Sequence, residues 1–263
     1  MQLPDSLSNI LIHVLGDERE QQMAYAVEHG FGVHVTDFHV PELLDDAAAC
    51  RKLVAWHRER LPAVRGVIAF HGAFVDLHPT AADSKILGAT RDRVQQTLDI
   101  AEEIGVELAV YHCEFDGLNL NADYLSVCAD RHASFWQSVL KGRSVAIALE
   151  NIREPGPEIT KVLVDAVGME TVGVCLDLGH LNVRSAAPAA EWVEALGARI
   201  KCLHLHDNDG SADQHLTVGK GTVDWAGFAG ALARSGLQPP FVAEITSLDS
   251  QRASLEFLAA MNQ

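Results

Sequence analysis

Short runs of apolar residues alternate along this chain with longer stretches in which apolar positions recur every three or four residues. The short runs predict β-strands, and the longer stretches predict amphipathic helices packed against them. The stretch that ends at Gly105 shows the helical pattern clearly, because Val94, Leu98, Ala101 and Ile104 fall on one face. The unit of strand, loop and helix repeats eight times over the 263 residues.

The eight predicted strands are Asn9–Val14, Phe31–Thr36, Gly66–Phe70, Val106–Tyr111, Val145–Leu149, Val172–Leu176, Ile200–Leu205 and Phe241–Ile245. The predicted helices are Glu18–His29, Glu42–Arg60, one that ends near Ile104, Ala122–Leu140, Glu158–Val167, Ala187–Leu196, Trp225–Arg234 and Gln251–Met261. Six helices are expected to end at a glycine, which takes the left-handed cap conformation without a Cβ clash. These residues are Gly30, Gly105, Gly142, Gly168, Gly197 and Gly236.

Strands that alternate with helices predict an α/β fold with a parallel sheet. Eight units in a chain of this length favour a single (β/α)8 TIM barrel over residues 1–263, with an open doubly wound sheet as the alternative. In such a barrel, functional side chains gather at the C-terminal ends of the strands.

Six consecutive strands, the third to the eighth, each end in a side chain that can bind a metal ion. These side chains are His71, His112, Glu150, Asp177, His204 and Glu244. The residues two positions earlier lie on the same strand faces and are small or β-branched, as a packed barrel interior requires. They are Ala69, Val110, Ala148, Cys175, Cys202 and Val242. We therefore expect the six ligands to point into the barrel mouth and to converge on a divalent ion.

The stretch Lys201–Gly221, around the seventh strand, adds further polar candidates. His206 shares the strand face of His204, and either a substrate contact or a structural role is compatible with that position. Asp213 and His215 follow in a turn-rich loop, and the loop ends in a Gly-Lys-Gly segment. Taken alone, this loop is also compatible with a solvated acidic surface. The six ligands in phase on the strands favour the metal site.

The remaining histidines carry weaker signals. His13 is expected to be a hydrogen-bonded core residue on the first strand. The helical histidines are expected to face solvent, and these are His29, His57 and His132. Three others lie on or near loops with only a weak claim to line the mouth, namely His34, His39 and His78. Phe74 is positioned to roof the pocket, and Trp225 is expected to pack rather than to stack on a ligand.

The composition limits the possible partners of the protein and the compartment in which it is expected. The chain has 20 basic and 36 acidic residues, a net charge of −16 that repels polyanions at long range. It has no apolar run long enough to span a bilayer and no charged-then-apolar leader, so we expect a soluble, cytoplasmic protein. Its five cysteines are odd in number and form no C-x-x-C motif, which predicts buried thiols without disulfides.

Together these residues resemble the xylose isomerase-like barrel superfamily, which includes endonuclease IV and many sugar isomerases and epimerases. The resemblance runs from about the third strand to the eighth and rests on the segments HGAF, LEN, CLDLGH, HLHD and DQHLTVGKG. It implies a divalent ion such as zinc, manganese, cobalt or magnesium, with one to three ions per chain.

Endonuclease IV relatives hold three metals with nine ligands, and each ligand has a match in this chain. The resemblance implies a first set of His71, His112 and Glu150. It implies a second set of Glu150, Asp177, His204 and Glu244, in which Glu150 bridges to the first ion. It implies a third set of His180, Asp213 and His215. The sugar epimerases keep only the second set, in which Glu150 and Glu244 double as the acid/base pair and His180 helps to hold the substrate.

The two branches imply different reactions. An isomerase or epimerase proceeds through an enediolate, with one glutamate removing a proton from carbon and the other returning one. A phosphodiesterase uses clustered zinc ions to form hydroxide and to stabilise the leaving oxygen. The loops favour the first reaction, since DNA binding needs many basic side chains. The loops after the third to seventh strands offer as basic candidates only Arg153, Arg184 and Lys220.

Acidic residues in the loops point the same way. The loop after the fourth strand has Glu114 and Asp116, and the loop after the second strand, TDFHVPELLDD, has no arginine. We therefore interpret the chain as a metal-dependent sugar or sugar-phosphate isomerase/epimerase-like enzyme that does not act on nucleic acid. The predicted substrate contacts are His180, His206, Phe74, Lys220 and Arg153.

Two alternatives stay open, an endonuclease IV-like AP endonuclease with three zinc ions and a metal-stabilised binding protein without turnover. The second ranks lowest, because two opposed glutamates at a metal are the arrangement that proton transfer needs. Ketose epimerases carry an arginine near the Asp213-x-His215 region, and this chain has none there. The substrate, the metal and the oligomeric state are left open.

Overall fold

The computed structural model describes residues 9–115 and 121–261, which form a closed barrel of parallel strands in the order β1 to β8. The strands are β1 Ile10–Val14, β2 Gly32–Val35, β3 Ile68–His71, β4 Leu108–His112, β5 Ala146–Glu150, β6 Val172–Asp177, β7 Ile200–Leu205 and β8 Phe241–Ala243. Pairing of Ile10 with Phe241 closes the barrel between β1 and β8. The predicted (β/α)8 barrel is confirmed.

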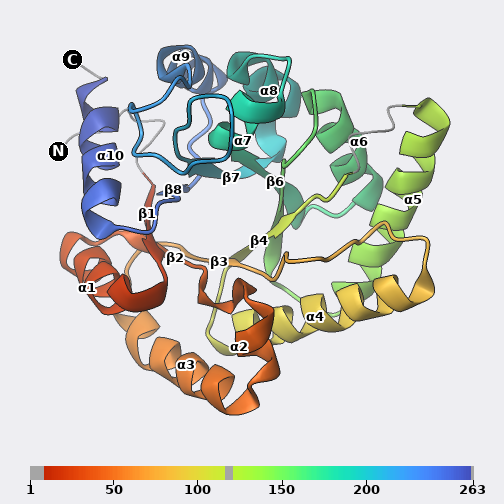
Figure 1. Cartoon of the computed structure of the whole chain (residues 1–263), viewed down its shortest axis with the longest axis horizontal. Helices are drawn as coiled ribbons and strands as arrows, with labels where there is room; N and C mark the ends of the chain where they lie inside the picture. Colours follow the sequence, from red (N-terminus) through yellow and green to blue (C-terminus); the bar gives the residue numbers. More distant parts are fainter. Residues whose placement is uncertain (1–8, 116–120, 262–263) are drawn as a thin grey trace.

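The helices form a ring around the strands (Figure 1). They are α1 Arg19–His29, α2 Pro41–Asp45, α3 Ala47–Arg60, α4 Ser84–Glu103, α5 Ala122–Val139, α6 Pro157–Val167, α7 Leu178–Arg184, α8 Ala189–Leu196, α9 Trp225–Ser235 and α10 Leu248–Ala260. All six glycines predicted to end helices have positive φ, between 52° at Gly197 and 82° at Gly142. Positive φ favours glycine, and the helices end at or shortly before these glycines, as predicted. Gly197 departs from the left-handed cap conformation, because its ψ is −130°.

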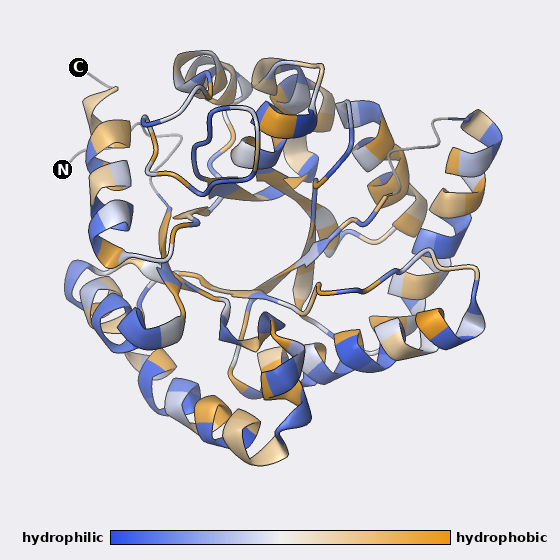
Figure 2. Cartoon of the chain, in the orientation of Figure 1, coloured by the Kyte–Doolittle hydropathy of each residue, from blue (hydrophilic) through white to orange (hydrophobic). Residues whose placement is uncertain are grey.

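Side chains of each strand divide between two cores, because successive residues point to opposite faces. The outward residues join a large core with the helices, which carry both hydrophilic and hydrophobic residues (Figure 2). The inward residues form a small separate cluster, made up of Leu11, Ala69, Leu108, Val110, Ala148, Cys175, Cys202 and Val242. All six residues predicted to fill the barrel interior belong to this cluster. This cluster fills the interior of the barrel. The next inward-pointing residues along the strands therefore lie at the bottom of the opening at the C-terminal end, which we call the mouth.

Two helical segments differ from the prediction. The helix expected over Glu42–Arg60 is divided at Asp46, whose backbone is non-helical (φ −86°, ψ 88°). The side chain of Asp46 accepts hydrogen bonds from the backbone N–H groups of Ala48 and Ala49, so it caps the start of α3. The short helix α7 was not predicted, and it begins immediately after Asp177, which caps it in the same way.

Two helical histidines expected to face solvent are instead fully buried, so that prediction was wrong for His57 and His132. The Nε2 atom of His57 lies 3.0 Å from Asp37 Oδ2, and the Nε2 atom of His132 accepts a 3.1 Å hydrogen bond from Trp136 Nε1. A histidine with such a partner can be buried at low cost. His29 is exposed, as predicted.

In the described part of the chain, no helix is long and apolar enough to cross a membrane.

Candidate metal centre

Glu150 lies at the middle of the barrel mouth. It ends β5, its side chain is 1% exposed, and its two carboxylate oxygens face different histidines. Oε2 is 3.1 Å from His71 Nε2, and Oε1 is 3.1 Å from His204 Nδ1. Glu244 follows β8 and places its own Oε2 3.1 Å from the same His204 Nδ1. Two glutamates from distant strands therefore flank one ring nitrogen.

Asp177 completes this group from the end of β6. Its Oδ2 lies 3.9 Å from His204 Nδ1, and its Oδ1 accepts a 2.6 Å hydrogen bond from the backbone N–H of His180. Asn151 fixes the backbone at this point, because it donates to the carbonyl of Asp177 and accepts from its N–H. We call Glu150, Asp177, His204 and Glu244 the floor of the mouth. All four floor residues are at least nine-tenths buried.

His71 and His112 form one wall beside the floor. The Nε2 atom of His112 lies 3.6 Å from Glu150 Oε2, and the ring of Phe74 stacks on His112 with centroids 4.3 Å apart. Phe74 also packs edge-on against His71 at 5.0 Å. These contacts place Phe74 over the two histidines, where the sequence predicted a roof. Its contact with a substrate stays a prediction.

Three residues surround the floor on its outer side, and we call His180, Asp213 and His215 the rim. Asp213 Oδ2 lies 3.3 Å from His180 Nε2 and 3.2 Å from His215 Nε2. The side chains of Asp213 and His215 are 41% and 39% exposed. His215 has a left-handed backbone (φ 48°), and its Nδ1–H donates to the carbonyl of Glu244 at 2.6 Å. The rim is therefore in direct contact with the floor, through the hydrogen bond from His215 to Glu244. In Figure 1 the loop between β7 and α9, which carries Asp213 and His215, lies over this side of the barrel.

His206 connects floor and rim. Its ring stacks on that of His215 with centroids 3.8 Å apart and planes 7° apart, and it is fully buried. Its Nε2 lies 3.2 Å from Asp177 Oδ2 and 3.6 Å from Asp213 Oδ1. The ring packs against Gly179, where an added Cβ would lie 1.9 Å from His206 Cε1. His206 is thus a buried bridge, and a direct substrate contact for it stays a prediction.

The histidines of the mouth share one arrangement. In four of them the Nδ1 atom lies against an acceptor outside the floor, while Nε2 faces a carboxylate. The four that follow this rule are His71, His112, His180 and His215. The Nδ1 atom of His180 also lies 3.4 Å from Glu150 Oε1. Backbone carbonyls are the Nδ1 acceptors for three of them, and a carbonyl can only accept. In the neutral ring that a metal ligand must have, Nε2 is then a lone pair aimed at a carboxylate. Without an ion, a proton takes that place in His180 and His215, because nearby carboxylates outweigh burial and raise the pKa of both rings. Opposed lone pairs are suited to a shared cation, so these donors fit a divalent metal.

The charges of the floor residues also indicate a site for a cation. Burial by itself lowers the pKa of His204, but the carboxylates of Glu244 and Glu150 outweigh burial and hold it well above its usual range. Burial raises the pKa of each glutamate, yet the charge and hydrogen bonds of His204 outweigh it and hold both well below the usual range. Both glutamates are therefore deprotonated and depend on positive charge between them. The donor set supplies imidazole and carboxylate, which zinc, manganese and cobalt accept.

The two basic residues predicted to contact substrate lie apart from this cluster. The side chain of Arg153 is 58% exposed, and its nearest carboxylate is Glu114 at 3.9 Å. Lys220 is exposed on its loop. Neither residue approaches the floor in the described structure, so their roles rest on the sequence alone. Asp116, one of the two predicted loop acids, lies outside the described residues.

Sequence reasoning gave His34 too little weight. It lies in β2, is fully buried, and its Nε2 is 3.2 Å from His204 Nε2. The signal was present in the strand alternation, because His34 pairs in register with His13 and Ala69, which are both inward-facing positions. His13 is a hydrogen-bonded core residue, as predicted.

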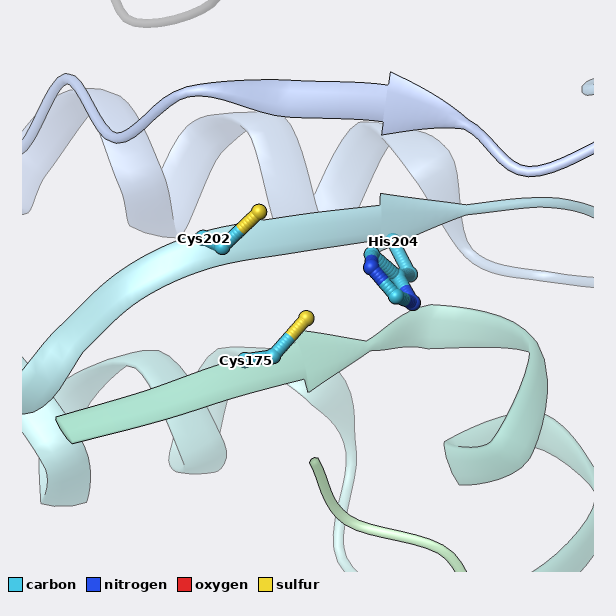
Figure 3. Close-up of side chains that lie close together, drawn as sticks. All are labelled: Cys175, Cys202 and His204. Atoms are coloured by element: carbon cyan, nitrogen blue, oxygen red, sulfur yellow. The ribbon is translucent and has the colours of Figure 1, made fainter. Parts of the chain in front are cut away.

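Below the floor lie two neighbouring thiols. Cys175 on β6 and Cys202 on β7 are paired in register, and His204 lies two residues further along β7 on the same face (Figure 3). All five cysteines are free and buried, as predicted. Burial raises the pKa of the Cys175 thiol well above its usual range. The hydrogen bond with Cys175 instead lowers the pKa of the Cys202 thiol.

A separate cavity of about 510 Å³ adjoins the Phe74 side of the mouth. It is bounded in part by Arg19, Lys52 and Trp56, from α1 and α3. His39 lines this cavity and stacks on Phe74 with centroids 5.2 Å apart. Through this stacking, and through that of Phe74 on His112, the lining of the cavity is in contact with the wall of the candidate metal centre.

Comparison with known proteins places this geometry in context. A Methanocaldococcus jannaschii protein described as uncharacterized is 28% identical over 170 residues, which cover 60% of this chain and 57% of that protein. A Sinorhizobium fredii protein of the same description is 30% identical over 102 residues, which cover 37% of this chain and 32% of that protein. The alignments thus span between a third and three-fifths of the length of these two relatives.

Solved structures match over nearly the whole length. The TTHB071 protein from Thermus thermophilus, described as soaked with ZnCl2, is 26% identical with a TM-score of 0.75 and covers 96% of this chain and 97% of its own. A D-tagatose 3-epimerase-like protein is 23% identical with a TM-score of 0.76 and covers 97% of both chains. The family model for the xylose isomerase-like TIM barrel matches residues 17–261, and the chain therefore belongs to the xylose isomerase-like TIM barrel family.

Proposed function

We propose that this protein is a metal-dependent isomerase or epimerase of a sugar or sugar phosphate. The observation that carries the proposal is the pair of buried glutamates, Glu150 and Glu244, each 3.1 Å from the same nitrogen of His204. They come from β5 and β8 and are held deprotonated. Two carboxylates on either side of one position are suited to remove a proton from a sugar carbon and to return one.

The floor residues would hold the ion, namely Glu150, Asp177, His204 and Glu244. When bound there, a divalent ion supplies Lewis-acid stabilisation of the negative charge that develops on adjacent sugar oxygens. One glutamate takes the proton from the carbon next to the carbonyl. The other takes up a proton from solvent and delivers it to the neighbouring carbon or to the opposite face, and the first glutamate then releases its proton to solvent. His180 would hold a sugar hydroxyl, and the anchoring of its Nδ1 by the carbonyl of Asn151 and of its Nε2 by Asp213 supports this role.

A phosphodiesterase is the second candidate, and a specific observation favours it. The three rim residues converge on one point, with Asp213 Oδ2 within 3.3 Å of two ring nitrogens, as a further metal site requires. The side chains around the mouth argue against a phosphodiesterase, because they offer few unpaired basic groups. Glu114 lies beside His112, and the nearby Arg153 is directed toward Glu114. A DNA backbone needs several unpaired basic groups.

The direct test of the proposed function measures proton exchange at the sugar carbon, so it does not depend on knowing the product. Protein purified without chelator is incubated in D2O with a panel of ketoses, aldoses and their phosphates, and deuterium at the carbon next to the carbonyl is measured by NMR. We expect incorporation with at least one sugar class, and none with Glu150→Gln. A surface variant, Glu103→Gln, serves as the matched control because Glu103 pairs with Arg58 on the outside of the barrel.

The competing activity is tested in parallel with a duplex that contains an abasic site. We expect weak, salt-sensitive binding and no cleavage at the rate of a dedicated repair enzyme, with either zinc or manganese added. Rapid cleavage, together with no deuterium incorporation across the panel, would overturn the isomerase proposal in favour of the phosphodiesterase.

A further inference from the structure

The first two strands carry no ligand of the proposed centre, yet each places a histidine behind it. His13 on β1 and His34 on β2 are 4% and 0% exposed. Thr36, just beyond β2, lies between them and is also buried. The Oγ1 atom of Thr36 is 3.1 Å from His34 Nδ1 and 2.8 Å from His13 Nε2. These residues form a continuous chain of hydrogen bonds that ends at His204.

The chain begins at a group that can only accept. The carbonyl oxygen of Ile245 lies 3.3 Å from His13 Nδ1, so this nitrogen carries the proton. In a neutral ring, His13 Nε2 is then an acceptor, and the hydroxyl of Thr36 donates to it. The hydroxyl oxygen is left to accept from His34 Nδ1–H. His34 Nε2 therefore has a lone pair and accepts from His204 Nε2–H, across 3.2 Å.

His13 is neutral, as the direction of the chain requires. Burial, the largest influence, lowers the pKa of His13 to about 4. His34 Nε2 and His204 Nε2 face each other across 3.2 Å, so only one of these two nitrogens carries a proton. Because each ring has one proton and each nitrogen has one partner, the direction of every hydrogen bond follows from the carbonyl of Ile245.

His204 is the exception among the histidines of the mouth. His71, His112, His180 and His215 each present Nε2 to a carboxylate and have another acceptor at Nδ1, whereas His204 has only carboxylates at Nδ1, those of Glu150, Glu244 and Asp177. A neutral histidine that donated from Nδ1 would have no lone pair for an ion at that position. The proton must therefore be held on Nε2 by an acceptor on the side of the ring that faces away from the carboxylates. Among the described residues, no backbone carbonyl accepts from this nitrogen. His34 is the acceptor.

We propose that His13, Thr36 and His34 are positioning residues, which form a relay that fixes the ring tautomer of His204 so that its Nδ1 lone pair faces the metal. This inference rests on the proposed function, because it needs a metal at the floor. It also explains why Thr36 follows β2 at this point. A hydroxyl can donate to one imidazole and accept from another through a single atom, whereas a methyl group of similar size can do neither.

An alternative use of these residues is a further metal site, since ligand atoms of His13, His34 and Glu244 lie within 4.8 Å of one another. The hydrogen bonds argue against it. Each ring nitrogen of His13 and His34 already has a partner, either Thr36, Ile245 or His204. An ion there would have to displace these bonds, and the number of ions bound per chain tests this directly.

The test compares Thr36→Val with Thr36→Ser. Zinc and cobalt affinities are measured by chelator competition, and ions per chain by elemental analysis, with circular dichroism as the check on folding. We expect Thr36→Val to bind the floor ion about 10- to 100-fold more weakly, the range typical when a partner of a metal-bound histidine is lost. Thr36→Ser keeps the hydroxyl and should stay near the wild-type affinity. The cobalt absorption spectrum of Thr36→Val should change as well, which a general loss of stability would not produce.

A second measurement needs no variant. In zinc-loaded wild-type protein with 15N-labelled histidine, NMR should show His34 protonated at Nδ1 and His204 protonated at Nε2. Protonation of His34 at Nε2, or equal metal affinity of Thr36→Val and wild type, would refute the relay while leaving the metal centre intact. A wild-type protein that binds no ion would refute the proposed function itself. An ion lost from Thr36→Val in addition to a retained floor ion would support the alternative site and overturn the relay.

Discussion

The floor and the rim of the barrel mouth use the same chemical groups in different surroundings. Floor residues stand at the ends of strands or directly after them, and their side chains are 0% to 9% exposed. Rim residues come from α7 and the loop after β7, and their side chains are 13% to 41% exposed. Carboxylate–imidazole contacts are stronger where water is excluded. We therefore expect the floor to hold an ion firmly and the rim to exchange ions or substrate hydroxyls.

The largest expected effect belongs to Glu150. Its carboxylate lies within 3.6 Å of ring nitrogens of four histidines, two of which are His71 and His204. Glu150→Gln keeps the shape of the side chain and removes its charge. We expect loss of the floor ion by elemental analysis and a fall in kcat of about 10³-fold, within the range for a lost acid/base group. Full activity without bound metal would contradict the distinction between floor and rim.

The double variant His71→Ala/His112→Ala tests whether the wall belongs with the floor or with the substrate. Under the proposed function the floor ion is retained and KM rises by about tenfold, as for the loss of binding that is equal in ground and transition states. Under the phosphodiesterase alternative, an ion is lost and kcat collapses. Metal content and kinetics on this single variant separate the two outcomes.

Asp213→Asn is the matched change at the rim. The carboxylate of Asp213 pairs with ring nitrogens of His180 and His215, which are both rim residues. We expect the floor ion to stay bound, and KM to rise severalfold through the lost orientation of His180, an effect smaller than at the floor. Loss of the floor ion in this variant would show that floor and rim form one cooperative metal cluster.

The smallest expected effect is a pH dependence at the rim. Burial lowers the pKa of His215, but its hydrogen bond to Asp213 and the nearby Glu244 raise it to about 9. A raised histidine pKa stabilises the fold below the unfolded value, and this stability is lost as pH rises toward 9. In chelator-treated protein, the stability difference between wild type and His215→Gln should therefore shrink between pH 6.5 and 9. The change should be no more than about 1 kcal/mol, because His215 is 39% exposed and solvent screens it.

Local patterns in the sequence were enough to predict the barrel and the inward positions near the ends of β3 to β8. Strand alternation every second residue and helical stripes report which side of an element is buried, and the glycines mark where helices end. His71, Glu150 and His204 could be predicted to face the mouth because a barrel sends every strand end to the same place. The split at Asp46 was missed, since a single capping aspartate leaves the apolar pattern of a helix nearly unchanged.

Contacts between distant residues were decided only by the tertiary structure. His57 and His132 sit on helices where sequence reasoning expected solvent, and their burial depends on Asp37 and Trp136 being within reach. His34 meets His204 from 170 residues away in the chain. A histidine looks the same in the sequence whether it binds a metal, supports a ligand or fills a core, because its ring has two nitrogens. Which role it takes is decided by the partner that each nitrogen finds once the barrel has closed.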